Sequence, residues 1–145
     1  MISSTSRRQF LSRTAAIGAG FGVWSSRSPV VRANESVLQG LSAACIGVGG
    51  KGSSDTSHIA EQGVSIVGLC DVDGGTVDKK SREFPDAGKF DDFREMLEKL
   101  GDKIDIVTVS TPDHTHAVAA LKAMQMKKHV YCQKPLTWSI HEARL

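Results

Sequence analysis

The sequence predicts an α/β fold built on a doubly wound parallel sheet, and three observations predict it. Short apolar runs of four to seven residues alternate with longer segments of helical periodicity, which is typical of βαβ units. The runs are rich in β-branched residues, as at 104–109, and therefore suit strands that helices cover on both faces. A glycine-rich turn follows the first run directly. Together these features place one domain at residues 41–145.

The apolar runs and the periodic segments give the expected order of elements. Strands are predicted at residues 42–47, 64–70, 87–90, 104–109 and 129–132. Apolar residues spaced by three and four predict crossover helices at residues 54–62, 76–84, 93–100 and 116–126, and a further helical pattern at 139–145.

Glycines and aspartates mark the ends of these helices. Gly63 and Gly101 stand where a residue of left-handed conformation closes a helix. Asp91 or Asp92 can cap the helix that begins at Phe93.

The three cysteines, Cys45, Cys70 and Cys132, are odd in number and widely spaced. Each lies in an apolar run, so we expect all three in the core rather than in a disulfide or a metal site.

Residues 1–33 are predicted to be a removable twin-arginine signal peptide. Residues 6–11 read SRRQFL, and a weakly apolar stretch at 15–24 follows that is too short to span a bilayer core of about 30 Å. Ala33 supplies the small residue before a cleavage site, and residues 34–40 form a polar linker. We therefore expect export by the twin-arginine machinery to a bacterial periplasm, without a stable membrane anchor. The alternative is a basic amphipathic helix, which would not require paired arginines before Phe-Leu.

Composition and charge indicate an ordinary globular chain. Of its 145 residues 40% are hydrophobic and 23% charged, which is enough apolar material for a core. The formal net charge is +2, but five of the 18 basic residues lie within residues 1–33, which leaves 13 against 16 acidic residues and a net charge of about −3. No cluster of Lys and Arg with interleaved aromatic residues remains, so we expect no nucleic-acid partner.

The glycine-rich turn has the spacing GxGxxG at Gly47, Gly49 and Gly52, between a strand and a helix. In that context the first glycine permits the tight turn, the second lets backbone approach a pyrophosphate, and the third allows close packing of helix and strand. The helix N-terminus presents free N–H groups to phosphate. Gly50 and Lys51 lie in the same turn and are also expected to contact the cofactor.

Asp71 supports the same interpretation. It ends the second strand 24 residues after Gly47, where a carboxylate accepts hydrogen bonds from the adenosine ribose. Its charge would repel a 2′-phosphate, so NAD is favoured over NADP, although Lys79 and Lys80 could weaken that preference. The sequence therefore predicts a Rossmann-type dinucleotide-binding domain; the alternative is a glycine-rich turn with an aspartate that caps the next helix.

Two loops follow the fourth and fifth strands, at the edge where open α/β sheets bind ligands. The first contains Ser110, Thr111, Pro112 and His116, and the second contains Gln133, Lys134 and Pro135.

With these loops and the glycine turn, the chain resembles the Gfo/Idh/MocA family of glucose-fructose oxidoreductases and inositol dehydrogenases. The resemblance implies that the first loop borders the nicotinamide ribose, through Ser110, Thr111, Pro112 and His116. It implies that Gln133, Lys134 and Pro135 also border the cofactor, with Lys134 beside the nicotinamide and the substrate hydroxyl. Gln133 departs from the pattern, since Glu is usual there, and the change removes a carboxylate that would favour protonated lysine.

Lys134 is the predicted catalytic residue. Oxidation of a CH–OH group requires that the hydroxyl proton leave or its developing charge be stabilised, and a desolvated lysine beside a cationic ring can do either. The alternative is a surface lysine before a turn proline. His114 and His116 form an HxH pair without further matching ligands, so we expect capping and packing from them and no metal.

The resemblance also implies what lies outside this sequence. Family members continue into a C-terminal α/β domain that supplies the substrate site and dimer contacts, so only the N-terminal domain is expected here and the chain alone should be inactive. The expected whole protein is a homo-oligomeric oxidoreductase that acts on a sugar or polyol. An NAD-dependent glycosidase of the same family and a non-catalytic cofactor-binding remnant are the alternatives.

Overall fold

The computed structural model describes residues 39–145 of the chain. The predicted signal peptide and most of the predicted linker at 34–40 lie outside the described residues. Among the described residues, no helix combines the length and the apolar character needed to cross a membrane.

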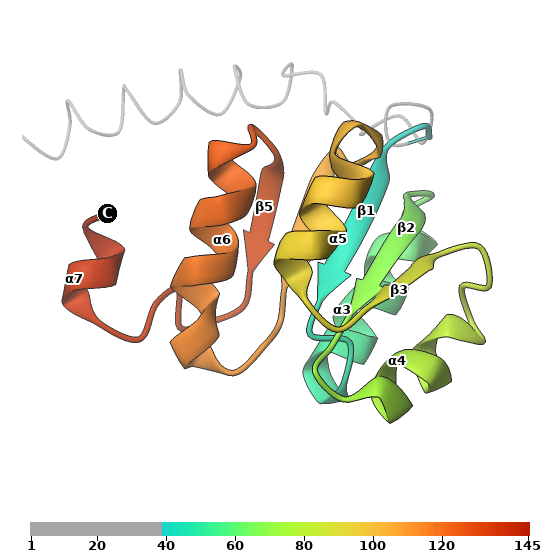
Figure 1. The fold of residues 1–145 in the computed structure, drawn as a ribbon, viewed down its shortest axis with the longest axis horizontal. Coiled ribbons are helices and arrows are strands. Elements are labelled where there is room, and N and C mark those ends of the chain that lie inside the picture. The colour runs from blue at the N-terminus through green and yellow to red at the C-terminus, as the bar shows by residue number, and fades with distance from the viewer. Residues whose placement is uncertain (1–38) are drawn as a thin grey trace, which may run out of the picture. The chain divides into compact units, whose positions relative to one another are not determined.

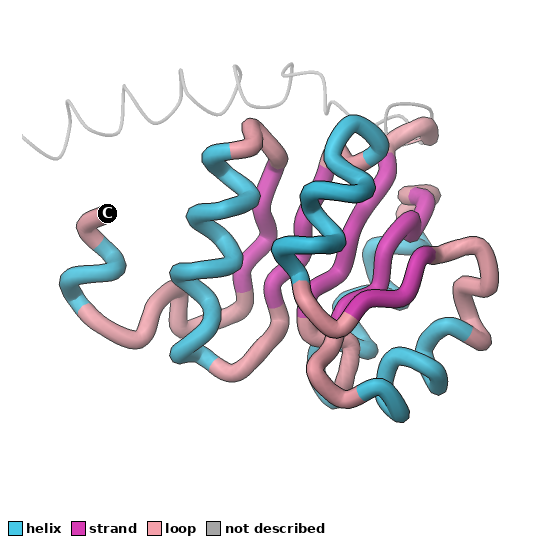
Figure 2. The backbone as a smooth tube through the Cα atoms, viewed as in Figure 1, coloured by secondary structure: helices cyan, strands magenta, loops and turns pink. Residues whose placement is uncertain are grey.

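Five parallel strands form one sheet in the order β3-β2-β1-β4-β5 (Figures 1 and 2). The strands are β1 (Ser42–Ile46), β2 (Ser65–Cys70), β3 (Gly88–Phe90), β4 (Ile106–Val109) and β5 (His129–Cys132). The central strand β1 pairs with β2 on one side and β4 on the other, and the chain reverses direction across the sheet between them. Ligands of doubly wound sheets bind at the carboxyl ends of the strands on either side of such a reversal.

Helices cover both faces of the sheet. They are α3 (Gly50–Glu61), α4 (Gly74–Ser81), α5 (Phe93–Leu100), α6 (His116–Gln125) and the short α7 (Ile140–Ala143). Helices α5 and α6 lie in front of the sheet in Figure 1, where Met96, Leu97 and the alanines of α6 pack on β1 and β4. On the opposite face, α3 and α4 enclose a second core cluster with Val48, Leu69 and Val77. The predicted α/β class and parallel sheet are confirmed.

The predicted strand bounds agree with the structure to within two residues, but α3 begins four residues earlier than the periodicity suggests. The first turn of α3 consists of small and polar residues of the glycine turn, so it carries no apolar signal.

Two of the predicted helix ends are confirmed and one is wrong. Gly63 has a φ of 86°, and Asp92 caps α5 by accepting a hydrogen bond of 2.8 Å from the N–H of Arg94. Gly101 does not adopt the left-handed conformation. Its φ is −38°, because the chain continues from α5 directly into a 3-10 helix, Gly101–Lys103.

All three cysteines are free. Cys45 and Cys70 are buried as predicted, whereas Cys132, near the edge of the sheet, is only partly buried. Burial raises the pKa of Cys70 to about 12, which keeps that thiol neutral.

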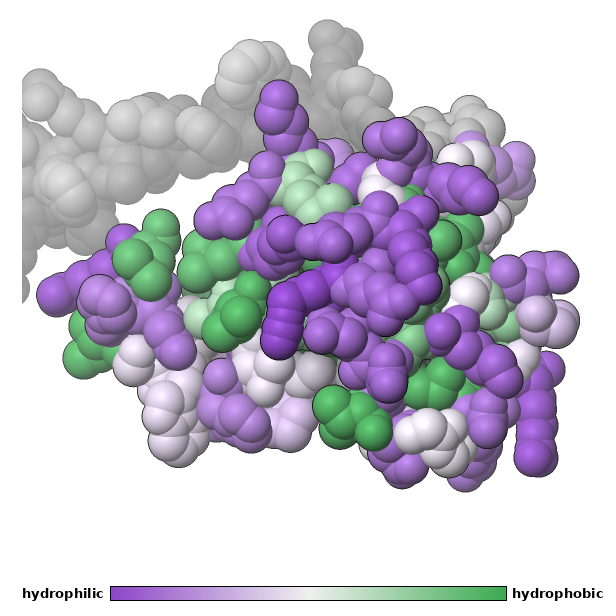
Figure 3. Space-filling view, viewed as in Figure 1, coloured by the Kyte–Doolittle hydropathy of each residue, from purple (hydrophilic) through white to green (hydrophobic). Residues whose placement is uncertain are grey.

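Apolar side chains gather on one part of the surface. In Figure 3 hydrophilic residues cover α5, and hydrophobic residues are concentrated around α6 and α7. The large exposed apolar residues of this region are Val118, Met124, Leu136, Trp138, Ile140 and Leu145.

Candidate dinucleotide-binding site

The glycine turn between β1 and α3 makes backbone contacts that a side chain would block. Gly47 has a φ of 78°, and a Cβ atom there would lie 2.7 Å from the backbone nitrogen of Thr111. A Cβ atom on Gly52 would collide with the carbonyl group of Gly47, with the carbonyl carbon at 2.8 Å. The sequence predicts both a tight turn and close packing here, and both are present.

The second glycine of the motif leaves room beside the acidic residue of β2. A Cβ atom on Gly49 would lie 3.2 Å from Cγ2 of Thr76 and 3.7 Å from Oδ2 of Asp71. A side chain here would press on the Thr76 methyl group, so glycine leaves space between the turn and the end of β2.

Gly50 and Lys51 form the start of α3. Gly50 has a φ of 46° and nothing within 4 Å of its Cβ position. The Lys51 ammonium pairs with the carboxylate of Asp55 one turn later, and this hydrogen bond raises the pKa of Lys51. In this structure Lys51 thus contacts its own helix, and its side chain is 60% exposed.

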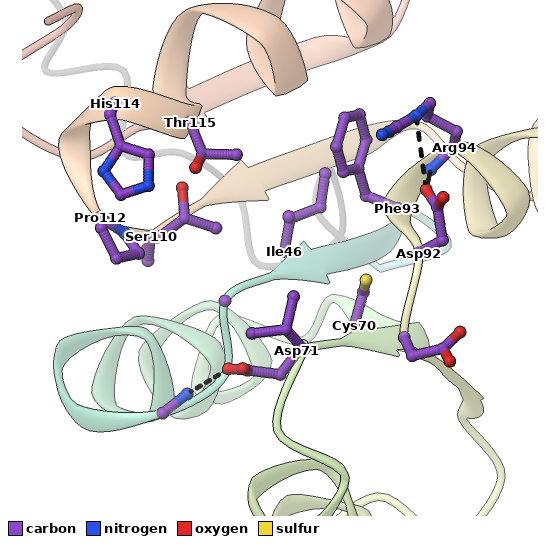
Figure 4. A pocket seen from close by; sticks show the side chains of 15 residues that line it. Ile46, Cys70, Asp71, Asp92, Phe93, Arg94, Ser110, Pro112, His114 and Thr115 are labelled. Carbon is purple, nitrogen blue, oxygen red and sulfur yellow. Dashed lines mark hydrogen bonds and ion pairs between the residues drawn. The ribbon is translucent and has the colours of Figure 1, made fainter.

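Asp71 is held at the carboxyl end of β2 by backbone groups. Its Oδ2 accepts hydrogen bonds from the N–H groups of Val48 at 3.0 Å and Gly49 at 3.3 Å, and its Oδ1 accepts one from Asp73 at 3.1 Å. Figure 4 shows the carboxylate directed at the glycine turn. The acidic residue and the glycine turn, which are far apart in sequence, therefore form one unit.

A cleft of about 560 Å³ opens above this unit, at the carboxyl ends of β1, β2 and β4. Four segments line it: the glycine turn, the end of β2, the start of α5 and the loop after β4 (Figure 4). The lining residues are Ile46, Gly47, Gly49, Cys70, Asp71, Val72, Asp91, Asp92, Phe93, Arg94, Ser110, Thr111, Pro112, His114 and Thr115.

The side of the cleft next to α5 was not predicted from the sequence. Phe93 and Arg94 line it, and the Arg94 guanidinium lies 5.0 Å from the centre of the Phe93 ring. Val72, which also lines the cleft, is 93% exposed. The signal that could have found these residues is the order of the sheet: α5 begins at the carboxyl end of β3, the strand beside β2.

The loop after β4 contributes a polar atom that lacks a partner. Thr111 Oγ1 is buried and has no hydrogen-bond partner. Among the described residues it is the one buried side-chain oxygen or nitrogen without a partner. Because Thr111 lines the cleft, a hydroxyl group of a bound ligand is a fitting partner.

His116 joins this loop to the loop after β5. Its side chain is 2% exposed, with Nδ1 at 2.7 Å from the carbonyl oxygen of Pro135 and Nε2 at 2.7 Å from that of Thr111. His114, by contrast, is exposed and lines the cleft. The described residues contain no group of three potential metal ligands.

The loop after β5 lies outside the cleft. Lys134 and Pro135 are exposed and do not line it, and the peptide bond between them is cis. Gln133 points away to Asp55, to which its Nε2 donates a hydrogen bond of 3.0 Å. The predicted catalytic role requires a desolvated lysine. Residues 39–145 do not cover Lys134, so they do not provide that environment.

The residues of the cleft suit a dinucleotide. An open glycine turn meets the N-terminus of a helix, a fixed carboxylate lies beside it, and the next loop contributes Thr111, whose hydroxyl group has no partner. These features match the needs of a pyrophosphate and of ribose hydroxyls.

Comparison with known proteins agrees with this geometry. Residues 41–144 match the Gfo/Idh/MocA oxidoreductase family, described as having an NAD-binding Rossmann fold. The chain belongs to this family. Its cofactor is accordingly NAD, as the sequence predicts.

Several relatives of this family member are known. A glycosyl hydrolase family 109 protein of Saccharopolyspora erythraea is 33% identical over 94% of this chain, and an alpha-N-acetylgalactosaminidase of Shewanella oneidensis is 32% identical over the same share. The chain spans about a third of the length of these curated relatives, 35% in each case. The crystal structure of myo-inositol 2-dehydrogenase from Lactobacillus plantarum, 26% identical, superposes with a TM-score of 0.67 over 73% of this chain and 31% of that one.

Proposed function

We propose that this chain supplies the NAD site of an enzyme that removes hydride from a CH–OH carbon of a sugar or polyol. The observation that carries the proposal is the cleft that the glycine turn, Asp71 and Thr111 line together. The likeness to myo-inositol 2-dehydrogenase, whose substrate is a polyol, supports the substrate class.

Each part of the site has its own role in binding or in the reaction. Bound NAD accepts a hydride from carbon. The N–H groups at the start of α3 bind the pyrophosphate, Asp71 accepts hydrogen bonds from the adenosine ribose, and Thr111 Oγ1 bonds a second ribose. Lys134 takes the proton of the substrate hydroxyl or stabilises its developing negative charge, once residues outside 39–145 have covered it.

The sequence relatives favour a particular use of this chemistry. The proteins from S. erythraea and S. oneidensis are named as glycosidases, and they are more similar to this chain than the dehydrogenase is. In a glycosidase of this kind, oxidation of the sugar is transient, and it assists elimination of the glycoside before the hydride returns. The second candidate function is therefore an NAD-dependent glycosidase that acts on an N-acetylgalactosaminide.

A first experiment tests the cofactor site. We expect calorimetric titration of the 145-residue chain to show NAD binding, and much weaker NADP binding because Asp71 repels a 2′-phosphate. Equal affinity for both dinucleotides would contradict the assigned role of Asp71.

A second experiment separates the two activities in the whole gene product. A dehydrogenase releases NADH in proportion to the sugar oxidised, whereas a glycosidase cleaves a nitrophenyl α-N-acetylgalactosaminide without net NADH. Retention of NAD with neither activity would instead identify a non-catalytic cofactor-binding protein.

We also propose that the protein is exported through the twin-arginine machinery. The SRRQFL motif at residues 6–11 supports this. Fractionation of cells that express the whole protein tests it: an R7K/R8K variant should remain in the cytoplasm, and an R27K variant, which lies outside the motif, should be exported. Export of both variants would refute the proposal.

A further inference from the structure

Asp55, in the second turn of α3, is a buried carboxylate that the proposed function does not use. Its side chain is 7% exposed and accepts three hydrogen bonds from side chains. The donors are the Lys51 ammonium, Ser110 Oγ at 2.8 Å and Gln133 Nε2 at 3.0 Å.

These donors come from three different parts of the site. Lys51 belongs to the glycine turn and α3, Ser110 to the loop after β4, and Gln133 to the loop after β5. Asp55 does not line the NAD cleft, but it lines a separate groove of about 380 Å³ with Thr108 and Tyr131. It therefore lies outside the cleft, and its side-chain contacts connect it to the two loops.

The hydrogen bonds fit an ionised Asp55. Burial alone would raise its pKa, but the bonds from Lys51, Gln133 and Ser110 together hold the pKa below its ordinary value. The other titratable groups of the adjacent groove are His58 on α3 and Tyr131 on β5. Neither adds a second carboxylate.

We propose that Asp55 is a positioning residue that holds the loop after β5 against the glycine turn and the loop after β4. The proposal includes a rule of charge: Asp55 and position 133 form a matched pair in which one side chain is a carboxylate and the other an amide. This inference rests on the proposed NAD site. It gives a reason for Gln133 in place of the usual glutamate, because a glutamate at this position would bring a second carboxylate within about one hydrogen-bond length of Asp55.

A set of four chains tests the pair: wild type, Q133E, D55N and the exchanged D55N/Q133E. NAD affinity is measured by calorimetry at pH 5 and pH 8. We expect Q133E to bind about tenfold more weakly than wild type at pH 8 and to recover much of the difference at pH 5, where the two carboxylates share a proton. The exchanged variant should bind within about threefold of wild type at both pH values, because it restores one carboxylate and one amide.

The control is Q62E, which adds the same charge at an exposed position on the same groove. It should stay within about twofold of wild type at both pH values, because charges on an exposed surface are screened. A Q133E variant that binds NAD like wild type at both pH values, or an exchanged variant no better than Q133E, would overturn the proposal.

Melting temperatures of the same chains keep the two proposals separate. If the wild-type chain binds no dinucleotide, the proposed function fails, but the pairing is still tested without ligand. Q133E should then melt at a lower temperature than wild type at pH 8, and D55N/Q133E should regain most of the loss. Absence of that recovery would refute the pairing.

Discussion

The two halves of the candidate site differ in how completely residues 39–145 form them. The first half, made of the glycine turn and Asp71, is held by backbone hydrogen bonds and by steric contacts that only glycine allows. The second half is made of the loops at 110–116 and 133–135. Hydrogen bonds to Asp55 and His116 hold these loops, and Lys134 is exposed.

The difference separates binding from chemistry. The first half presents its ligand groups fully within residues 39–145, so affinity for NAD is a property of this chain. The environment that would make Lys134 reactive is not formed by these residues. Turnover therefore has to be measured on the whole protein, and each half can be tested by itself.

The largest effect is expected where the first half is most crowded. In Gly52→Val the new side chain collides with the carbonyl group of Gly47, which is backbone and cannot move aside cheaply. Overpacking of this kind costs about 3 kcal/mol, which corresponds to a melting temperature lower by roughly 15 °C in a domain of this size. Thermal unfolding followed by circular dichroism measures the change.

Gly74→Val is the matched control, since Gly74 also lies in the first turn of a helix and has nothing within 4 Å of its Cβ position. It should melt within a few degrees of wild type. Equal losses in both variants would mean that the glycine turn is not a packed unit, and the contrast between the halves would fail.

The next effect is on NAD affinity. Asp71→Ala removes the ribose acceptor and also frees the N–H groups of Val48 and Gly49. A loss of about 2 kcal/mol, or roughly thirtyfold in Kd, is expected from calorimetry.

Asp73→Ala provides the comparison for Asp71. Asp73 caps α4 through Gly75 and Thr76 and does not line the cleft. Its removal should cost about 1 kcal/mol of stability and leave NAD affinity unchanged. A loss of affinity as large as that in Asp71→Ala would show that the effect comes from the loop rather than from the ribose contact.

The fold was predictable from the sequence because its signals are local. Apolar runs located every strand, periodicity located four helices, and GxGxxG with Asp71 located the first half of the site. The wrong prediction at Gly101 has the opposite cause, because a local signal did not decide the structure there. Glycine is a common helix terminator, yet at Gly101 the chain continues into a 3-10 helix, and the packing of that helix decides between the two outcomes.

The second half was only partly predictable, because its contacts join residues distant in sequence. Asp55 and Gln133 are 78 residues apart, and neither position has a periodic or motif-based signal for the pair. Phe93 and Arg94 reach the cleft through the order of the strands. The resemblance to a family supplied Lys134, but no pattern in the sequence indicates that its side chain is exposed in this chain.

A smaller effect is expected on acidification. The pKa of Asp55 is lower in the folded chain than its ordinary value near 4, so its ionised form stabilises the fold above that pH, and the contribution is lost as the pH falls through the folded value. Asp55→Asn should lower the free energy of unfolding by about 1 kcal/mol at pH 7 and by less at pH 3. Urea unfolding at both pH values measures this, with the exposed Asp102→Asn as control. An equal loss at pH 3 and pH 7 would show that the carboxylate charge does not contribute.

The smallest effect on this chain is expected at the residue that matters most for turnover. Lys134 is exposed and does not line the cleft, so Lys134→Ala should leave NAD affinity within about twofold of wild type. In the whole protein the same substitution should lower kcat by roughly a hundredfold or more, because proton transfer in the transition state loses its acceptor. Lys103 is also exposed, but it precedes β4 and lies at the amino-terminal end of the strands, far from the cleft. Lys103→Ala should change neither quantity. If Lys134→Ala weakened NAD binding in this chain as strongly as Asp71→Ala, Lys134 would already contact the cofactor, and binding and chemistry would not be divided between the glycine turn and the loop after β5.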